Sequence, residues 1–218
     1  MIVLAIGFGW VLFGSSLIVV KSVVVTGNHL VSANQVRSAA GISTGAKMIR
    51  VDTGAAAHRV EGINQVQSAT VSKSWPDRIV ITVHERTPAL AVAEGAQGDQ
   101  SAGYDLVDQG GVVVESVKTR PPGLPFYQTS AAASSLRGDP SVAAAVTVLH
   151  EVPVAVKRAV IAVSATDPGN VQLSLSNGVT VVWGDTSRAQ QKATELTALM
   201  RTHASYYDVS APGTAVTK

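Results

Sequence analysis

The first twenty residues, Met1 to Val20, constrain this chain more than any other stretch, because they carry no charged side chain before Lys21. A helix rises about 1.5 Å per residue, so a run of this length spans roughly 30 Å, the thickness of a bilayer's hydrocarbon core. A helix also satisfies its backbone hydrogen bonds internally, as lipid requires. We therefore expect residues 1–20 to form a transmembrane helix that contacts the lipid bilayer.

Two other interpretations of this run are a cleaved secretory signal and a buried core helix. A signal has a basic start, a shorter apolar region and an Ala-x-Ala cleavage site. No Lys or Arg precedes this run, and Ile18-Val19-Val20-Lys21-Ser22 lacks the cleavage pattern. Twenty residues without a polar face would also be long for a core helix. Both alternatives are disfavoured, although the run by itself does not encode the direction of insertion, because Lys21 is the only charge nearby.

The composition of the remaining chain excludes several classes of function. The chain has 17 basic and 15 acidic residues, a net charge of +2 and 5% aromatic residues. Nucleic-acid binding needs a basic face that neutralises phosphates, so we expect no nucleic-acid partner. The absence of cysteine excludes disulfides, thiolate metal sites and a cysteine nucleophile.

Residues 21–88 show the order strand, helix, helix, strand, strand. Ser32 with Gln35 three residues later forms a capping-box pattern, and Gly41 is placed to end that helix. Trp75-Pro76-Asp77-Arg78 suits a tight turn between the last two strands. The expected strands are residues 21–27, 66–75 and 79–85, and the expected helices follow Ser32 and cover residues 55–60. Helices on one face of a small sheet make a compact α+β domain.

Residues 89–210 are expected to form a second, mixed domain with an antiparallel sheet and flanking helices. Asp139-Pro140 predicts the start of one helix, which Pro153 ends, and Asp185 is placed to cap a last helix that reaches Met200. Gln109-Gly110-Gly111 and Asn177-Gly178 are hairpin signals. The expected strands are residues 89–94, 104–108, 112–115, 160–164, 171–176, 179–183 and 206–210, followed by a tail over residues 211–218.

A search for catalytic or metal-binding patterns is negative. In His84-Glu85 and His150-Glu151, a proline or valine stands where the second metal-binding histidine of a zinc helix would be needed. The stretch Gly41–Met48 is one residue short of a phosphate-binding loop, and Met48 replaces its Ser or Thr. We therefore expect no enzyme, no cofactor and no metal site.

Two stretches resemble the FtsQ/DivIB family of bacterial cell-division proteins. They are Val23-Val24-Val25-Thr26-Gly27-Asn28 and the longer run from Ser74-Trp75-Pro76-Asp77-Arg78 through His84-Glu85-Arg86-Thr87-Pro88-Ala89. Residues 106–113 and 124–127 are also similar to family segments. The resemblance implies a single-pass anchor over residues 1–20, a POTRA domain over 21–88 and an FtsQ-type β domain over 89–210. The family also has a short cytoplasmic tail before the span, which we expect to be missing from this start.

The resemblance further implies a non-enzymatic scaffold of the divisome. Its partners would be FtsB/DivIC-like and FtsL-like single-span division proteins and, indirectly, the septal peptidoglycan synthase complex. The two domains would lie outside the cell membrane, at the septum. We expect the last strand to form a sheet edge to which a partner strand is added, with Pro212 limiting the pairing. The implied partner-binding residues are Tyr206, Tyr207, Val209, Ser210, Ala211, Gly213 and Val216.

Two alternative functions belong to other classes. A POTRA-type polypeptide-binding component of a translocation or membrane-assembly machine would need more POTRA copies or a large barrel, for which this chain lacks the length. A cell-wall hydrolase would need an acid/base pair that the sequence does not show. Both are weaker than the scaffold hypothesis.

Overall fold

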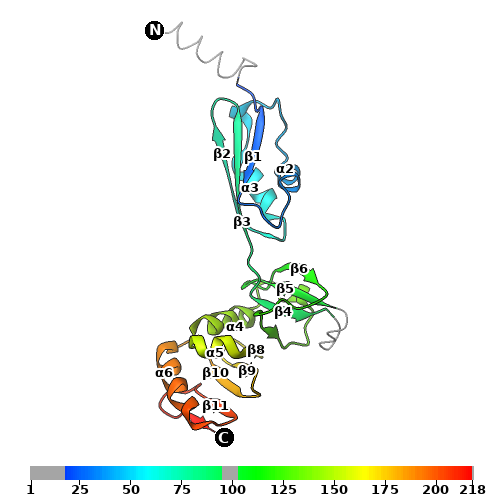
Figure 1. Ribbon diagram of the computed structural model, residues 1–218. Coiled ribbons are helices and arrows are strands. Elements are labelled where there is room, and N and C mark those ends of the chain that lie inside the picture. The colour runs from blue at the N-terminus through cyan, green and yellow to red at the C-terminus, as the bar shows by residue number, and fades with distance from the viewer. Residues whose placement is uncertain (1–17, 95–102, 218) are drawn as a thin grey trace, which may run out of the picture. The chain divides into compact units, whose positions relative to one another are not determined.

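The computed structural model describes residues 18–94 and 103–217, and the chain divides into two compact units, Met1–Arg86 and Thr87–Lys218 (Figure 1). Most of the predicted membrane span, residues 1–17, lies outside the described residues. Within the described ranges, no helix is both long and apolar enough to cross a bilayer. The mixed α+β class predicted from the sequence is confirmed for both units.

The first unit has the predicted order of elements. Ser32 accepts a hydrogen bond from the backbone N–H of Gln35, and Gly41 ends the first helix in the left-handed conformation, with a φ of 62°. The second helix is longer than predicted because Asp52 caps it through the N–H of Ala55. The elements are β1 (Ser22–Thr26), α2 (Ala33–Ala40), the 3-10 turn η1 (Met48–Arg50), α3 (Thr53–Glu61), β2 (Val66–Ser74) and β3 (Arg78–Glu85).

The sheet of the first unit has the order β1-β3-β2, in which β3 pairs in parallel with β1 and antiparallel with β2. Alternate residues of β3, namely Ile79, Ile81 and Val83, point into the core. They pack with Val36 and Ala40 of α2 and with Ala56 and Val60 of α3. Both helices therefore cover the same face of the sheet, and the opposite face is left open.

The chain enters the first unit at the end of the predicted span. The backbone N–H of Val20 donates to the carbonyl of Ala46 at 2.8 Å, and Gly45 N–H donates back to Val20 at 2.8 Å. The carbonyl of Ile18 accepts from Met48 N–H at 3.2 Å, and the Val20 side chain is 1% exposed. Residues 18–20, which we assigned to the span, thus pair with the link between α2 and η1.

The second unit contains more elements than the sequence predicted. Three short ones were missed: β7 and β12, which have only two residues each, and α5, which Pro153 separates from α4. The strands are β4 (Leu90–Ala93), β5 (Tyr104–Val107), β6 (Val113–Val117), β7 (Phe126–Tyr127), β8 (Val160–Ala165), β9 (Val171–Leu175), β10 (Thr180–Gly184), β11 (Tyr206–Asp208) and β12 (Val216–Thr217). The helices are α4 (Pro140–Glu151), α5 (Val154–Ala159) and α6 (Ala189–Leu199), with 3-10 turns η3 (Ala133–Ser135) and η4 (Met200–Thr202).

These strands form one sheet in the order β12-β11-β10-β9-β8-β7-β4-β5-β6. The predicted antiparallel sheet is wrong in part, since β4–β7, β7–β8 and β10–β11 pair in parallel. Parallel neighbours need a crossover. Here α4 and α5 lie between β7 and β8 in the chain, and α6 lies between β10 and β11. Helix α4 packs its buried face, including Val142, Ala145 and Leu149, into the core of this unit.

Candidate functional site

The C-terminal strand β11 is held by its inner neighbour β10. The two strands are parallel, with Val181 opposite Tyr207, and the N–H of Val209 donates to the carbonyl of Val182 at 2.9 Å. The Tyr207 hydroxyl accepts from the N–H of Ala204 at 2.9 Å. Strand β11 is therefore fixed to the body of the unit and presents only its outer side to a further strand.

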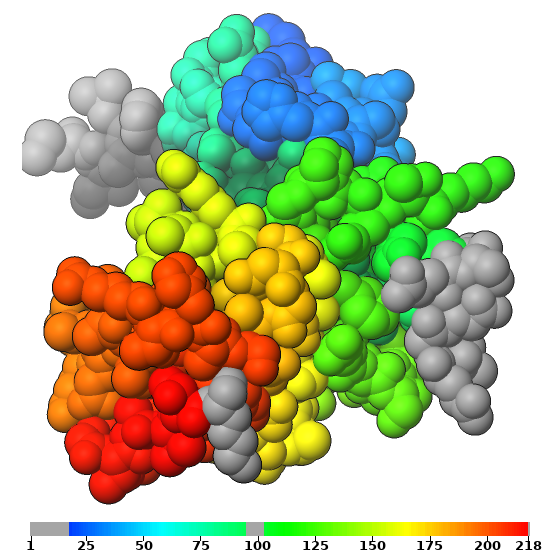
Figure 2. All heavy atoms as spheres, turned by 60° about the horizontal axis from the view of Figure 1, so that its bottom comes forward, coloured from blue at the N-terminus to red at the C-terminus, as the bar shows by residue number. Residues whose placement is uncertain are grey.

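That outer side is already occupied. Residues 209–215 turn back, and β12 pairs antiparallel with β11, placing Thr217 opposite Tyr207 and Val216 opposite Asp208. Our expectation that Tyr206–Ser210 forms the sheet edge is wrong at Tyr207 and Asp208. The edge is β12, in the stretch where we expected only a tail. In Figure 2 these C-terminal residues (red) lie on the surface of the second unit.

The predicted partner-binding residues fall into three sets by their exposure to solvent. The side chains of Tyr207 and Val209 are 2% and 0% exposed and belong to the core. Ala211, Gly213 and Val216 are exposed, Val216 to 48%. Tyr206 and Ser210 are partly exposed. The residues of the last two sets are accessible to another molecule, whereas the side chains of Tyr207 and Val209 are buried in the core of the unit.

The turn that leads into β12 is tied to helix α6. Glu195 Oε1 accepts from the backbone N–H of Gly213 at 3.0 Å, and Thr214 N–H donates to the carbonyl of Ala211 at 3.1 Å. Gly213 has a φ of 91°, in the region that favours glycine. Glu195 is thus a positioning residue for the edge. Sequence reasoning missed it because it lies 18 residues from its partner along the chain.

The C-terminal end of β11 is also fixed by a close approach between two backbones. Gly184 ends β10 with a φ of 77°, and a Cβ at this position would lie 2.7 Å from the Cβ of Ser210. The Asp208 carboxylate accepts from the N–H and the hydroxyl of Ser210 at 3.0 and 2.7 Å. The chain can turn toward β12 here because residue 184 has no side chain.

Helix α6 is fixed to the unit by a buried lysine. The ammonium of Lys192, which is fully buried, donates to the carbonyl and the Oδ1 of Asp185 at 2.8 and 2.6 Å. Hydrogen bonds from Lys192 and Ser187 lower the pKa of Asp185 to about 2. Burial raises the pKa of Glu151, and the attraction of Lys192 opposes this rise. Asp185 is therefore not the cap we predicted for α6; Arg188 holds that position with a φ of 51°.

A recess of about 320 Å³ lies beside the start of β11. Its walls come from the β9–β10 turn, η4 and the loop before β11, and its lining residues are Asn177, Val179, Met200, His203, Ala204, Ser205 and Tyr207. The lining mixes polar and apolar groups. Such a recess could accept a partner's side chain.

Across the described ranges, no group of three or more His, Cys, Asp or Glu side chains could hold a metal ion. His84 and His150, the two histidines of the His-Glu pairs, are both exposed and lie in different units. Neither pair is therefore assembled into a zinc site by the described part of the chain.

Two family models match consecutive parts of this chain. The model described as "POTRA domain, FtsQ-type" matches residues 19–86, and the model described as "Cell division protein FtsQ/DivIB, C-terminal" matches residues 97–210. The second match contains β11 and ends before β12.

Curated relatives match along nearly the whole chain. The cell division protein FtsQ of Mycobacteroides abscessus is 35% identical over 209 residues, which cover 96% of this chain and 64% of that protein. The cell division protein FtsQ of Streptomyces bingchenggensis is 35% identical over 219 residues, which cover 94% of this chain and 78% of that protein. The chain thus spans about two thirds to four fifths of these relatives. A solved structure, the major extracytoplasmic domain of DivIB from Geobacillus stearothermophilus, is 18% identical with a TM-score of 0.35 and covers 54% of this chain and 97% of that one.

Proposed function

Since the chain belongs to the FtsQ/DivIB family of cell-division proteins, we propose that it is a membrane-anchored, non-enzymatic scaffold of the divisome. Its partners are FtsB/DivIC-like and FtsL-like single-span division proteins, and it links them to septal peptidoglycan synthesis. The apolar run before Ile18 anchors it in the cell membrane, and both units, with residues 18–20 in the first of them, lie outside the membrane at the septum. Family membership favours this role over a translocation component.

The observation that supports the binding mode is the two-residue edge strand β12. A sheet edge presents backbone N–H and C=O groups that a strand from another chain can pair with. Val216 on β12 is exposed, and β12 is held by its pairing with β11, the strand whose Tyr207 side chain is buried in the core. Strand addition at β12 would supply affinity through the backbone, and side chains such as Val216 would supply selectivity.

Substituting Val216 tests this binding mode without disturbing the core. Val216→Asp places a charge at the proposed contact, so the affinity for the extracytoplasmic segment of an FtsB-type protein should fall at least about tenfold, or ~1.4 kcal/mol. The matched control is Val154→Asp, at an exposed valine on α5 of the same unit. The control should bind within about twofold of wild type.

The measurement is a titration of the full chain in detergent with the labelled FtsB-type segment. Equal affinity of wild type and Val216→Asp would overturn β12 as the contact. Loss of binding in both variants would show that exposed charge in general, and not this edge, is responsible. Tyr207 and Val209 are unsuitable test sites because their side chains are in the core.

A further inference from the structure

The end of the first unit at which the chain enters carries an exposed tryptophan. Trp75 lies in the turn between β2 and β3 and is 54% exposed. Lys21, the first residue after the predicted span, lies beside the same turn: its N–H donates to the carbonyl of Asp77 at 2.7 Å, and its ammonium is 3.1 Å from the Asp77 carboxylate. The tip of this hairpin is therefore next to the point where residues 1–20 lead into the unit.

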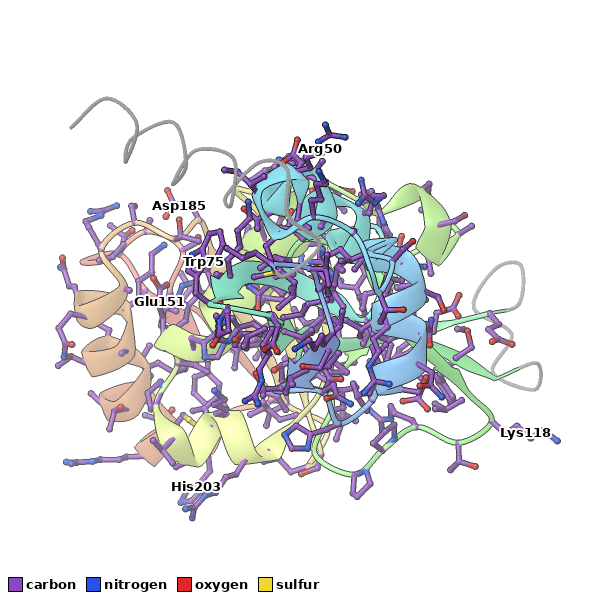
Figure 3. The ribbon with its side chains drawn as sticks, turned by 90° about the horizontal axis from the view of Figure 1, so that it is seen from above. Arg50, Trp75, Lys118, Glu151, Asp185 and His203 are labelled. Atoms are coloured by element: carbon purple, nitrogen blue, oxygen red, sulfur yellow. The ribbon has the colours of Figure 1, made fainter. Side chains whose placement is uncertain are left out.

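Further exposed residues come to the same end from η1. The ammonium of Lys73, near the end of β2, donates to the carbonyl of Ile49 at 3.4 Å, which places η1 beside the hairpin. Ile49 and Arg50 are both exposed. In Figure 3, Arg50 reaches outward from the ribbon. Arg78, also exposed, pairs with Ser22 and Ser74 at the base of the turn.

We call this set, Lys21, Ile49, Arg50, Lys73, Trp75 and Arg78, the hairpin-tip surface. It combines one aromatic and one aliphatic side chain with four cations, and Asp77 is the acidic side chain paired with one of them. Tryptophan concentrates at membrane–water interfaces because its ring is apolar and its N–H is polar. Lysine and arginine near a bilayer are attracted to anionic headgroups. The chemistry of this surface is that of a membrane interface.

The path of the chain is an independent reason to place this end of the first unit at the membrane surface. Residues 1–20 form one apolar, uncharged run. The end of this run already belongs to the first unit, since the backbones of Ile18 and Val20 are hydrogen-bonded to residues 45–48. No polar linker therefore separates the run from the unit. A span that ends within a few residues of Ile18 would hold this end of the unit at headgroup depth. A headgroup layer is only about 5–8 Å thick on each side of the bilayer. Side chains at this end are close enough to reach it.

We propose that the hairpin-tip surface rests on the bilayer into which the apolar run before Ile18 inserts, with Trp75 in the headgroup layer and the four cations against anionic lipid headgroups. This contact would fix the orientation of the first unit on the membrane, whereas an anchor alone would let the unit rotate freely. It rests on the predicted span and requires no division partner, so its test is independent of binding at β12.

The test uses the full chain in lipid nanodiscs and the quenching of tryptophan fluorescence by brominated lipid. Trp10→Phe removes the tryptophan of the span, which leaves Trp75 and the fully buried Trp183 of the second unit. Phosphatidylglycerol brominated near the headgroup should quench most of the Trp75 emission, relative to the same lipid without bromine. The additional substitution Trp75→Phe should abolish this quenching.

The matched control is a tryptophan at the far end of the same unit. Leu30 is exposed and its N–H donates to Glu85, at the opposite end of β3 from Arg78. Eight residues of strand place these ends roughly 20 Å apart, beyond the headgroup layer. Leu30→Trp in the Trp10→Phe/Trp75→Phe background should show no bromine quenching.

The charged side chains are tested by Arg50→Gln/Arg78→Gln, or by replacing phosphatidylglycerol with brominated phosphatidylcholine. Each change should reduce the quenching of Trp75, and both arginines are exposed, so folding should be unaffected. Trp75 emission that ignores bromine and stays open to acrylamide would overturn the proposal, as would a chain that does not insert into the disc. Protection of Trp75 only after a division protein is added would assign the surface to that protein and also overturn the proposal.

Discussion

Glu85, the last residue of β3, holds the loop between β1 and α2. Its carboxylate accepts hydrogen bonds from three consecutive backbone amides, those of His29, Leu30 and Val31, each at 2.8 Å. Burial opposes ionisation, but the bonds from these amides outweigh it and lower the pKa of Glu85. The Glu-Arg-Thr-Pro segment that carried the family resemblance thus begins with a residue whose carboxylate joins the end of β3 to the loop between β1 and α2.

Glu85→Gln should loosen this loop while leaving its size unchanged. Hydrogen bonds to a charged acceptor are stronger than neutral ones by about 1 kcal/mol, so hydrogen exchange at residues 29–31 should accelerate about fivefold at neutral pH. The pKa of Glu85 is lowered in the folded state. Its contribution is therefore complete above the unfolded pKa of about 4.3 and is lost as pH falls through the folded pKa.

The difference between wild type and Glu85→Gln should accordingly shrink at acidic pH. Exchange followed by mass spectrometry over residues 27–32 measures it, with Glu115→Gln, at an exposed position on β6, as the control. A difference that persists unchanged well below pH 4 would contradict the role of the Glu85 charge.

Lys192 and Asp185 make an asymmetric pair, because the lysine is fully buried and the aspartate side chain is 53% exposed. Removal of the Asp185 carboxylate leaves the buried ammonium of Lys192 without its counter-ion, whereas Lys192→Met replaces the lysine with an apolar side chain of similar length. Asp185→Ala should therefore destabilise the second unit by about 2–4 kcal/mol, and Lys192→Met by about 1 kcal/mol or less.

Thermal unfolding monitored by Trp183, in a Trp10→Phe/Trp75→Phe background, checks the order of these two effects. Trp183 is buried in the same unit. A larger loss for Lys192→Met than for Asp185→Ala would contradict this order, and would show that the ammonium stabilises the unit mainly through the Asp185 carbonyl and Glu151 instead of the Asp185 carboxylate.

At the scale of elements, local signals predicted most helices and strands correctly. Ser32 and Asp139 cap their helices, and Asn177-Gly178 turns β9 into β10, because each depends on neighbours within four residues. The parallel pairings, the two-residue strands β7 and β12, and the hold of Glu195 on Gly213 were not predicted. They are determined by contacts between distant residues, which periodicity does not encode.

For the candidate site, the sequence predicted the location but not which side chains are exposed. The stretch from Tyr206 to Val216 does form the C-terminal border of the sheet, but which of its side chains are exposed depends on the return of the chain at Gly213. Tyr207 and Val209 look like surface candidates in the sequence and are core residues in the fold. Alternation along one strand cannot reveal that a second strand lies beside it.

Glu195→Ala tests whether α6 positions the edge strand. Without the carboxylate, the Gly213 amide loses its acceptor, and a solvent-exposed hydrogen bond of this kind contributes about 1 kcal/mol. Exchange at residues 211–217 should accelerate, and affinity for the FtsB-type segment should fall about fivefold or more. Thr194→Ala, at the exposed neighbouring position of α6, should change neither. Faster exchange with full binding would show that the partner does not need a preformed β12.

At the scale of the whole molecule, the two units meet different surroundings. The first unit receives the apolar run at one end and carries the hairpin-tip surface there, while the second unit ends in the sheet edge at β12. In the function that we propose, the first unit would hold the chain at the membrane and the second would bind strands of partner proteins. The two roles are assigned from the exposed surface of each unit, which is the hairpin-tip surface with Trp75 in the first and the sheet edge at β12 in the second.

The most direct test of this account is hydrogen exchange of the full chain with and without the extracytoplasmic segment of an FtsB-type protein. Strand addition predicts that the amides of β12, at Val216 and Thr217, become protected on binding, and that Val216→Asp removes this protection. Binding that leaves residues 206–217 unprotected, or protects a different surface of the second unit instead, would contradict the proposed scaffold edge.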